Sequence, residues 1–567
     1  MITTHAASLQ HLLAELIELD PDATLTYDVV DGAPVSCSRA QFGTRVECLS
    51  HELTEVGLRS GQCVAVLLPN WSDALVWQFA AASIGAHVIG LNTRYNTAEV
   101  AHILTSARPA VVAVALNFHG LDLFGTLSTA VTATPSVAPP VVAVVAGPDG
   151  NAEHHADLNL GSGHWFSGSS DINGARVPDT PDTTALTPAG RSVDDMRLAV
   201  AFTTSGSTGT PKLAAHSESG VVRHARADAA IMGVVPGDVA LCVLPVSGVF
   251  GYSLAMAMLA GGGALLMVPV FDARDTLRRM TQLQVTHCAG GDDLFGRLYD
   301  TWHSGEHHQM SALRWIGIAD FLGRSGQIAA WLRDEFGTQT TGVFGSSEVF
   351  ALALLWRDTD PEDVRWNGGG RPVDTAMTVR IADPVTDTVV PEGEQGELQF
   401  RGPNVVDAYL GNPDASANAF TRDGWFRSGD LGVATGDGGY TYVCRMGDAL
   451  RLRGFLVDPA EIEHRLAQHP DVHTAKVVGI TDAAGYTQAV GFVVPAETDS
   501  DDAATTGSAE LRTWCAQTLA AFKVPSAIHI INAMPTTVGG NGTKIRAVVL
   551  RDYAQQWSDR ERDFRHD

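Results

Sequence analysis

Short apolar strand segments alternate with helical segments along much of this chain. From residue 62 the pattern gives strands at 63–68, 87–91 and 110–116 and helices at 71–86 and 97–107, and a similar alternation returns at 313–345. Strands and helices in regular succession form parallel βαβ units, whose helices cover both faces of a sheet. We therefore predict an α/β fold built on doubly wound parallel sheets.

The pattern changes twice towards the C-terminal end. Short β segments with Gly-rich turns occupy residues 379–445, which predicts a small β-barrel-like part, and a compact α+β pattern begins after residue 446. We predict a large N-terminal domain at 1–446 and a small C-terminal domain at 447–567. The stretch 130–195 is rich in Pro, Gly, Ser and Thr and is predicted to form irregular surface loops.

Charge limits the ligands that this chain can attract. The 567 residues include 64 acidic and 38 basic side chains, a formal net charge of −26. Such a field repels polyanions, which argues against nucleic acid as a partner. A small anion such as ATP then needs a local cradle of amides, hydroxyls and a few cations. The seven cysteines are dispersed without metal-ligand spacing, and we expect reduced thiols.

The apolar segments do not predict a membrane protein. The first 21 residues resemble an acidic amphipathic helix and lack the basic and apolar regions of a signal peptide. Residues 239–271 carry no charged side chain, but Pro and Gly interrupt them repeatedly. We expect a strand, a loop, a buried helix near 250–260 and another strand there. The predictions are therefore no transmembrane segment and a cytoplasmic location.

The strongest local motif is a run of hydroxyl and glycine residues after an apolar strand at 198–203. Glycines let backbone N–H groups turn inward to bind an anion, hydroxyls add donors, and a lysine adds a positive charge. The spacing differs from the Walker A loop and from the dinucleotide-binding turn. The predicted ATP phosphate-binding residues are Thr203, Thr204, Ser205, Gly206, Ser207, Thr208, Gly209 and Lys212.

The order of motifs resembles the superfamily of adenylate-forming enzymes, which includes acyl-CoA synthetases, adenylation domains and luciferases. The resemblance covers about residues 40–552 and is closest in style to AMP-forming acyl-CoA synthetases. The matching segments are TSGSTGTPK at 204–212, FGSSEV at 344–349, GWFRSGDLG at 424–432, a hinge-like segment at 442–463 and a lysine-bearing segment at 534–552. Each segment alone has an ordinary structural explanation, but their joint order does not.

The resemblance implies roles for particular residues. It implies that Lys544 and Glu348 are catalytic, with Glu348 as the Mg²⁺ ligand, and that Asp448 is the hinge. The implied adenine- and ribose-binding residues are Ala319, Asp320, Phe344, Gly345, Ser347, Asp430 and Arg445. The implied acyl pocket contains Val246, Ser247, Gly248 and Phe250, and the thiol-site candidates are Arg453, Gly454 and Phe455.

The implied reaction has two steps. A carboxylate attacks the α-phosphate of ATP and expels pyrophosphate, so positioning and charge neutralisation dominate catalysis. Lys544 is expected to bridge the carboxylate and the α-phosphate. In the family, the C-terminal domain is mobile and swings about the hinge aspartate, which removes the lysine and brings in the thiol of coenzyme A.

The sequence departs from the family pattern at three places. Gly248 stands where relatives carry a histidine, Gly447 stands where the hinge motif has a lysine, and the lysine segment reads GGNGTKI. The expected pocket segments supply no Arg or Lys for a second carboxylate. We therefore expect an apolar mono-acid with a fatty, aromatic or polycyclic body.

Several functional alternatives stay open at this stage. The chain could load the phosphopantetheine of a carrier protein, such as an acyl carrier protein, or stop at the acyl-AMP. A non-catalytic nucleotide-binding protein and a luciferase-like oxidation of the adenylate are more distant readings. Whether the protein forms a homodimer is also open.

Overall fold

The computed structural model describes most of the chain. The described residues are 8–116, 118–148, 165–167, 197–204, 211–305, 307–321, 323–446, 450–452, 455–457, 459–481, 487–496, 507–519, 523–539 and 542–566. The chain divides into two compact units, one of Met1–Val379 with Gln399–Ser428 and one of Arg380–Leu398 with Gly429–Asp567. The domain boundary at residues 446 and 447 stays a prediction.

The first unit contains an eight-stranded sheet in the order β19-β9-β8-β4-β3-β5-β6-β7. Its strands are β3 (Cys63–Leu67), β4 (His87–Gly90), β5 (Val111–Ala115), β6 (Val141–Val145), β7 (Trp165–Ser167), β8 (Leu198–Thr203), β9 (Leu213–Ser217) and β19 (Ala408–Tyr409). Strands β8, β4, β3, β5, β6 and β7 pair in parallel, while β9 pairs antiparallel with both β8 and β19. The predicted parallel βαβ units are present.

One expectation fails in this sheet. Residues 130–195 were expected to form irregular surface loops, but β6 pairs with β5 over five consecutive residues. The preceding helix, α5 (Leu123–Ala133), also extends into this stretch. The Val-rich core of β6 is only five residues long and is flanked by Pro139 and Pro140 before it and by Gly147 and Pro148 after it, so composition over a long window hides it.

The larger sheet also has its core in the first unit. There β14-β13-β12-β10-β11-β1 form a run of parallel neighbours, flanked by antiparallel β2 on one side and by antiparallel β15 and β16 on the other. These strands are β1 (Thr24–Val30), β2 (Ala33–Ser38), β10 (Val239–Cys242), β11 (Ala264–Met267), β12 (His287–Gly291), β13 (Trp315–Ala319), β14 (Gln339–Ser346), β15 (Phe350–Leu355) and β16 (Gly369–Pro372).

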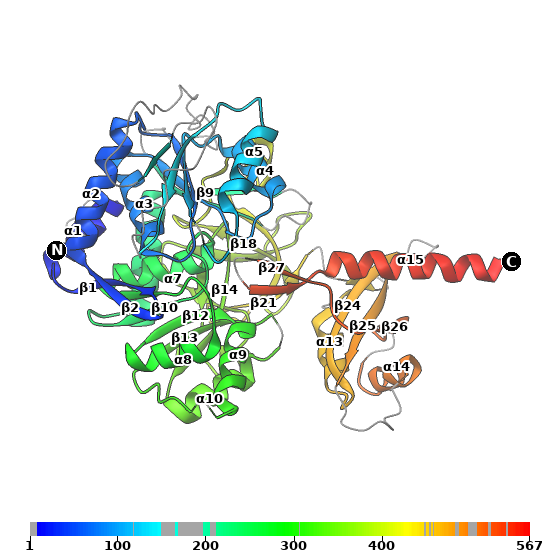
Figure 1. The fold of residues 1–567 in the computed structure, drawn as a ribbon. Coiled ribbons are helices and arrows are strands. Elements are labelled where there is room, and N and C mark those ends of the chain that lie inside the picture. Colours follow the sequence, from blue (N-terminus) through cyan, green and yellow to red (C-terminus); the bar gives the residue numbers. More distant parts are fainter. Residues whose placement is uncertain are drawn as a thin grey trace. The chain divides into compact units, whose positions relative to one another are not determined.

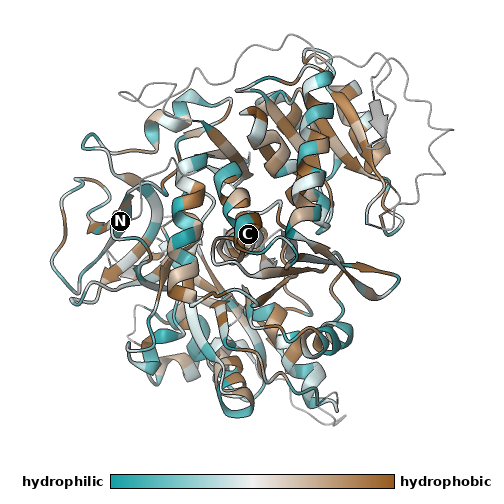
Figure 2. Cartoon of the chain, turned by 90° about the vertical axis from the view of Figure 1, so that its left-hand side faces the viewer, coloured by the Kyte–Doolittle hydropathy of each residue, from teal (hydrophilic) through white to brown (hydrophobic). Residues whose placement is uncertain are grey.

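Helices cover these sheets. They are α1 (Leu9–Leu19), α2 (Arg39–Glu55), α3 (Ser72–Ile84), α4 (Thr97–Ala107), α6 (Glu218–Met232), α7 (Val249–Ala260), α8 (Ala273–Gln282), α9 (Asp292–His303), α10 (Ser325–Phe336), α11 (Glu362–Arg365) and α12 (Pro413–Asn418). In Figure 1, α8, α9 and α10 lie together beside β12 and β13. Figure 2 shows apolar strands, and helices whose turns alternate between polar and apolar residues.

Local sequence explains where several helices begin. Asn96 caps α4 by accepting hydrogen bonds from the backbone N–H groups of Ala98 and Glu99, and the Glu99 side chain accepts one in return from the Asn96 backbone. This reciprocal pair satisfies amides that the first helical turn leaves unpaired. The predicted helix at 97–107 therefore has the observed bounds.

The charge-free segment forms the predicted strand, loop, buried helix and strand. All residues of α7 from Val249 to Leu259 are buried. Its apolar surface is therefore covered by protein on all sides. Within the described ranges, none of the helices combines the length and the apolar character that a membrane span requires.

The second unit has a small α+β body. A three-stranded sheet, β24 (Val472–Thr481), β25 (Thr487–Pro495) and β26 (Ala527–Ile530), packs with α13 (Pro459–Ala467), α14 (Ser508–Ala516) and α15 (Ala547–His566). The remaining strands, some of which cross the division between the units, are β17 (Thr378–Ala382), β18 (Gln395–Arg401), β20 (Phe426–Ala434), β21 (Tyr440–Arg445), β22 (Leu450–Leu452), β23 (Phe455–Val457), β27 (Thr536–Gly539) and β28 (Gly542–Ile545). The predicted α/β fold class is confirmed.

Candidate active site

The predicted phosphate loop is held at both ends by strand pairing. Thr203, at the end of β8, pairs with Leu213, at the start of β9. Beyond it, the Thr204 N–H donates to the Lys212 carbonyl oxygen at 2.8 Å, and the Lys212 N–H donates to Thr204 Oγ1 at 3.2 Å. The tip, with the predicted Ser205, Gly206, Ser207, Thr208 and Gly209, lies outside the described residues.

Tyr409 links two residues that the sequence predicts to act on ATP. Its hydroxyl donates to Glu348 Oε1 at 3.0 Å, and Lys212 Nζ lies 4.9 Å from the centre of its ring. Tyr409 is almost fully buried, and β19 carries it because that strand pairs with β9. The carboxylate predicted to bind Mg²⁺ and the lysine predicted to bind phosphate therefore share one tyrosine.

His216 ties the phosphate strands to the turn that carries Glu348. Its Nε2–H donates to the Ser347 carbonyl oxygen at 2.7 Å, and the Ser347 hydroxyl donates to the Thr203 carbonyl oxygen at 3.4 Å. Burial lowers the pKa of His216 to about 4, so the imidazole is neutral near pH 7 and carries its proton on the donating nitrogen. The predicted Thr203 and Ser347 thus lie in hydrogen-bond contact.

The Phe350 ring, which follows the same turn, packs against two histidine rings. The Phe350 ring lies 4.2 Å from His216 and 4.6 Å from His224 between ring centroids. Burial lowers the pKa of His224 to about 3 and raises the pKa of Asp228 well above its ordinary value, and the Asp228 carboxyl lies 3.2 Å from the imidazole. A Cβ at Gly345 would lie 2.0 Å from the Phe350 carbonyl oxygen, so the hairpin requires a glycine there.

Two residues predicted to bind the nucleotide also have structural partners. The Asp320 carboxylate accepts the Ser325 hydroxyl at 2.6 Å at the start of α10, directly after Ala319 ends β13. The Phe344 ring stacks on Phe400 with 6.0 Å between centroids and 6° between planes. The adenine- and ribose-binding roles of Ala319, Asp320, Phe344 and Gly345 stay predictions.

The predicted acyl-pocket residues lie on the loop between β10 and the first turn of α7. Asn70 fixes this loop, since its side chain accepts the Val246 N–H at 2.9 Å and donates to the Leu244 carbonyl oxygen at 2.8 Å. Gly248 begins α7 with an ordinary φ of −105°, and Phe250 is buried in that helix. The backbone at Gly248 can therefore accept a side chain.

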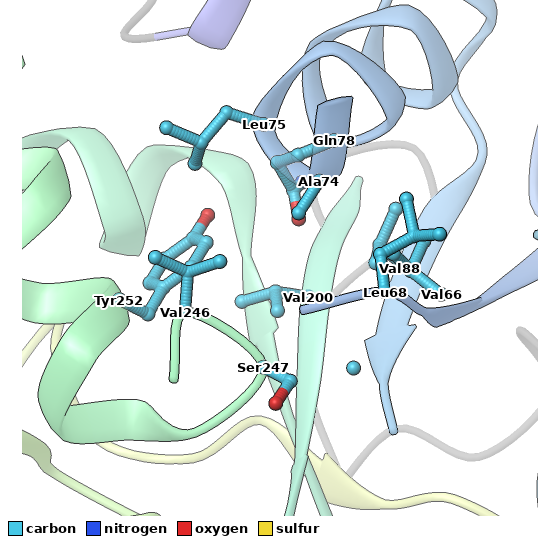
Figure 3. Close-up of a pocket in the computed structure, with 11 residues that line it drawn as sticks. Val66, Leu68, Ala74, Leu75, Gln78, Val88, Val200, Val246, Ser247 and Tyr252 are labelled. Carbon is cyan, nitrogen blue, oxygen red and sulfur yellow. The ribbon is translucent and has the colours of Figure 1, made fainter. Parts of the chain in front are cut away.

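A small cavity of about 20 Å³ lies against this loop (Figure 3). Val246 and Ser247 line it, whereas Gly248 and Phe250 do not. The other lining residues are Val66, Leu68, Ala74, Leu75, Gln78, Val88, Gly90, Val200 and Tyr252. A Cβ at Gly90 would lie 2.5 Å from Ser247 Cα, so the end of β4 contacts the loop directly.

The remaining described site residues are in the second unit. Asp430 on β20 pairs with Arg445 on the neighbouring β21, and their side chains form an ion pair at 2.8 Å. Asp430 is buried, whereas 43% of the Arg445 side chain is exposed. The preceding Gly429 has a φ of +71°, a conformation that favours glycine, and its N–H donates to Glu397 Oε1 at 3.0 Å.

The other predicted residues are less fully described. Lys544 belongs to β28, where it pairs with Thr537 of β27, but its side chain lies outside the described part. Asp448, Arg453 and Gly454 fall outside the described residues, as does the side chain of Phe455 on β23. Their roles stay predictions.

Comparison with known proteins decides the family. A family model described as "AMP-binding enzyme" matches residues 15–410, and its C-terminal domain model matches residues 461–541. This chain belongs to the AMP-binding enzyme family. The resemblance to adenylate-forming enzymes, inferred from the motifs, is confirmed.

Individual relatives span nearly the whole chain. A 3-[(3aS,4S,7aS)-7a-methyl-1,5-dioxo-octahydro-1H-inden-4-yl]propanoyl:CoA ligase from Rhodococcus jostii is 27% identical, covering 97% of this chain and 98% of its own. A feruloyl-CoA synthase from Amycolatopsis is 28% identical, covering 91% and 93%. The crystal structure of ATP-bound MatB from Rhodopseudomonas palustris matches with a TM-score of 0.78 and 23% identity, covering 97% and 99%, which shows the shared fold.

Sequence reasoning missed Tyr409, His216 and the Tyr95 hydroxyl, which lies 2.5 Å from Thr203 Oγ1. His216 lies on the strand directly after the phosphate loop, where an isolated histidine in an apolar strand could have been noticed. Tyr409 lies far along the chain, and only the pairing of β19 with β9 brings it to the site.

We predict that Tyr409→Phe weakens the binding of MgATP while preserving the fold. The substitution keeps the ring over Lys212 but removes the hydrogen bond to Glu348, and a hydrogen bond to a charged group contributes about 1.5–3 kcal/mol. We expect the dissociation constant of MgATP to rise about tenfold or more. Calorimetric titration of MgATP measures the effect. The control is Tyr553→Phe on α15, and an equal effect of both variants would contradict the role of Tyr409.

We predict that Asp430→Ala weakens nucleotide binding by about tenfold or more, because a buried carboxylate predicted to hold the ribose hydroxyls is lost. Arg445 also loses its ion-pair partner, so Arg445→Ala is the matched variant. The measurement is the dissociation constant of ATP compared with that of 2′,3′-dideoxy-ATP. An equal loss of affinity for both nucleotides would show that Asp430 only supports the strand pair.

Proposed function

We propose that this chain activates a hydrophobic carboxylic acid with ATP, releases pyrophosphate and transfers the acyl group from acyl-AMP to coenzyme A. The observation that best supports this proposal is a set of contacts between the predicted ATP-binding residues. Tyr409 contacts both Glu348 and Lys212. His216 binds the Ser347 carbonyl oxygen, and the Ser347 hydroxyl binds the Thr203 carbonyl oxygen. The predicted reaction class, an AMP-forming acid–thiol ligase that uses ATP and CoA, is confirmed by the family models and by the CoA ligases among the relatives.

In the first step, a carboxylate oxygen attacks the α-phosphorus and the bond to pyrophosphate breaks. Two anions approach each other, so the chain must supply positive charge and hydrogen-bond donors at the phosphates. Lys212 supplies a cation beside the phosphate loop, and Lys544 is proposed to neutralise the charge that develops at the α-phosphate. Asp430 is proposed to hold the ribose without transferring a proton.

Mg²⁺ fits the donor set around Glu348. Among the described residues there is no group of three His, Cys, Asp or Glu side chains that could hold a metal by themselves. Mg²⁺ commonly binds to one or two carboxylates together with substrate phosphates, and Glu348 offers one such carboxylate with a defined orientation. When bound, Mg²⁺ would offset the charge of the leaving pyrophosphate.

In the second step, a thiolate attacks the carbonyl carbon of the acyl-AMP, the bond from that carbon to the phosphate-bound oxygen breaks, and AMP leaves. Lys544 has no evident task in this step. We therefore propose that Asp448 acts as the hinge that exchanges Lys544 for the thiol-site candidates Arg453, Gly454 and Phe455.

The proposed acid has an apolar body. The described lining of the cavity beside the acyl loop contains no charged side chain. The two relatives named above act, by their names, on a bicyclic propanoic acid and on a feruloyl group. Both acids place a carboxylate on a largely apolar skeleton, which supports the same class here.

Three parts of the prediction remain proposals. Loading of a carrier-protein phosphopantetheine would replace CoA as the final acceptor, and adenylation alone would leave the acyl-AMP as the product. A homodimer and a cytoplasmic location are the other two. The acceptor is the part that an assay of the purified chain resolves directly.

The test is acid-dependent exchange of pyrophosphate into ATP over a library of carboxylic acids, followed by thioester formation with CoA. The proposal expects exchange with apolar mono-acids and a CoA thioester with the same acids. Thioester formation only with a phosphopantetheinylated carrier protein would replace CoA as the acceptor, and ADP in place of AMP would contradict the reaction.

We predict that Lys544→Ala lowers the rate of acid-dependent exchange by roughly a hundredfold or more, because it removes a charge that stabilises the transition state. The dissociation constant of ATP should change little. The exchange rate and calorimetric ATP binding are measured together, with Lys523→Ala as a control on the same unit. Exchange near the wild-type rate would show that Lys544 is not the catalytic lysine.

We predict that Gly248→His disfavours bulky acids. The backbone at Gly248 has a conformation that any residue can adopt, and an imidazole there would add bulk to the predicted acyl pocket. Overpacking of this kind costs about 1–3 kcal/mol, or about tenfold to a hundredfold in selectivity. The measurement is the ratio of kcat/KM for a polycyclic acid to that for a short-chain acid. A ratio equal to that of the wild type would place Gly248 outside the acyl pocket.

A further inference from the structure

The side chain of Tyr252 lines a small, mainly apolar cavity. The cavity of about 20 Å³ beside the acyl loop is lined mainly by Val, Leu and Ala side chains, and Tyr252 is one of its few polar neighbours. Figure 3 shows its hydroxyl oxygen on the side that faces Leu75. The cavity is large enough for one water-sized group, such as a single hydroxyl or carbonyl oxygen.

The Tyr252 hydroxyl is buried and has no hydrogen-bond partner within the described residues. Only 3% of the residue is exposed, and the hydroxyl oxygen neither donates to nor accepts from another described group. Burial raises the pKa of this phenol, so it stays protonated and can donate a hydrogen bond. A buried hydroxyl without a partner is unfavourable, so a ligand oxygen that reached it would bind favourably.

The position of Tyr252 connects this hydroxyl to the proposed reaction. Its ring contacts Phe202 edge-on at 5.3 Å, and Phe202 directly precedes Thr203 at the start of the phosphate loop. The next residue, Ser253, accepts the Ala351 N–H at 3.3 Å, on the strand that follows the Glu348 turn. Tyr252 therefore lies between the acyl loop and the residues proposed to bind ATP.

Gln78 is the other large polar side chain at the cavity, and its role is structural. Its Nε2 donates to the Ala199 carbonyl oxygen at 3.0 Å, which fixes the amide against β8. Tyr252 has no comparable contact among the described residues. Of the two, Tyr252 is the group whose hydrogen bond is left for a ligand.

We propose that Tyr252 recognises an oxygen atom on the acyl group, so that the preferred acid is an apolar skeleton carrying a ketone or a hydroxyl. This inference rests on the proposed function and names the substrate class within it. A ketone accepts the phenol hydrogen, and a hydroxyl can accept that hydrogen or donate its own. An acid without this oxygen leaves the phenol unpaired and is disfavoured.

The test compares cyclohexylpropanoic acid with its ring-keto and ring-hydroxy derivatives. The kcat/KM for acid-dependent pyrophosphate exchange is measured for the wild type and for Tyr252→Phe. We expect the wild type to prefer an oxygenated acid by about tenfold to a hundredfold, and the variant to lose that preference. The control is Tyr299→Phe on α9, where the ring packs against Trp331, and its preference should equal that of the wild type.

The outcomes separate the two proposals. Exchange that proceeds with the same preference in the wild type and in Tyr252→Phe overturns the role of Tyr252 and leaves the proposed function standing. Absence of exchange with all three acids and with the wider library contradicts the proposed function, and this inference fails with it. Thermal melting provides a second check, since Tyr252→Phe should melt no lower than the wild type, and a drop of several degrees would show that the hydroxyl already has a partner in the free protein.

Discussion

The hydrogen bond from His216 to the Ser347 carbonyl oxygen joins the two parts of the sequence that are proposed to bind MgATP. One part is the strand pair that holds the phosphate loop, and the other is the turn that carries Glu348. The bond requires a neutral imidazole with its proton on Nε2, and burial lowers the pKa of His216 to about 4, which secures that state. The Phe350 ring, tilted by 32°, packs against the same imidazole at 4.2 Å between ring centroids.

The short-range contacts in the candidate site are important because the protein is strongly acidic. A net charge of −26 gives ATP no attraction at long range, so affinity must come from groups placed close to the phosphates. The observed partners follow that logic: Lys212 is held over Tyr409, and Glu348 is oriented by the hydroxyl of the same tyrosine. Close positioning thus takes the place of a favourable overall field.

The sequence predicted the parts of the fold that local patterns encode. The helix at 97–107 was predicted with its observed bounds because Asn96 and Glu99 form a capping pair, whereas β6 was missed because five Val-rich residues were averaged into a Pro- and Thr-rich stretch. In the candidate site, residues inside motifs, such as Ser347 and Asp430, are predicted from the sequence, and their roles stay predictions. Tyr409 could not be predicted, because a strand pairing between distant segments places it.

The origin of the oxygen in the product AMP tests the central claim most directly. If a carboxylate oxygen attacks the α-phosphate, and the thiolate later attacks the carbonyl carbon, one oxygen of the acid must leave with AMP. Turnover of an apolar acid labelled with ¹⁸O in its carboxylate, with MgATP and CoA, should therefore give AMP that carries one labelled oxygen, detected by mass spectrometry. Label in inorganic phosphate together with ADP would instead indicate an acyl phosphate and would contradict acyl-AMP formation by this chain.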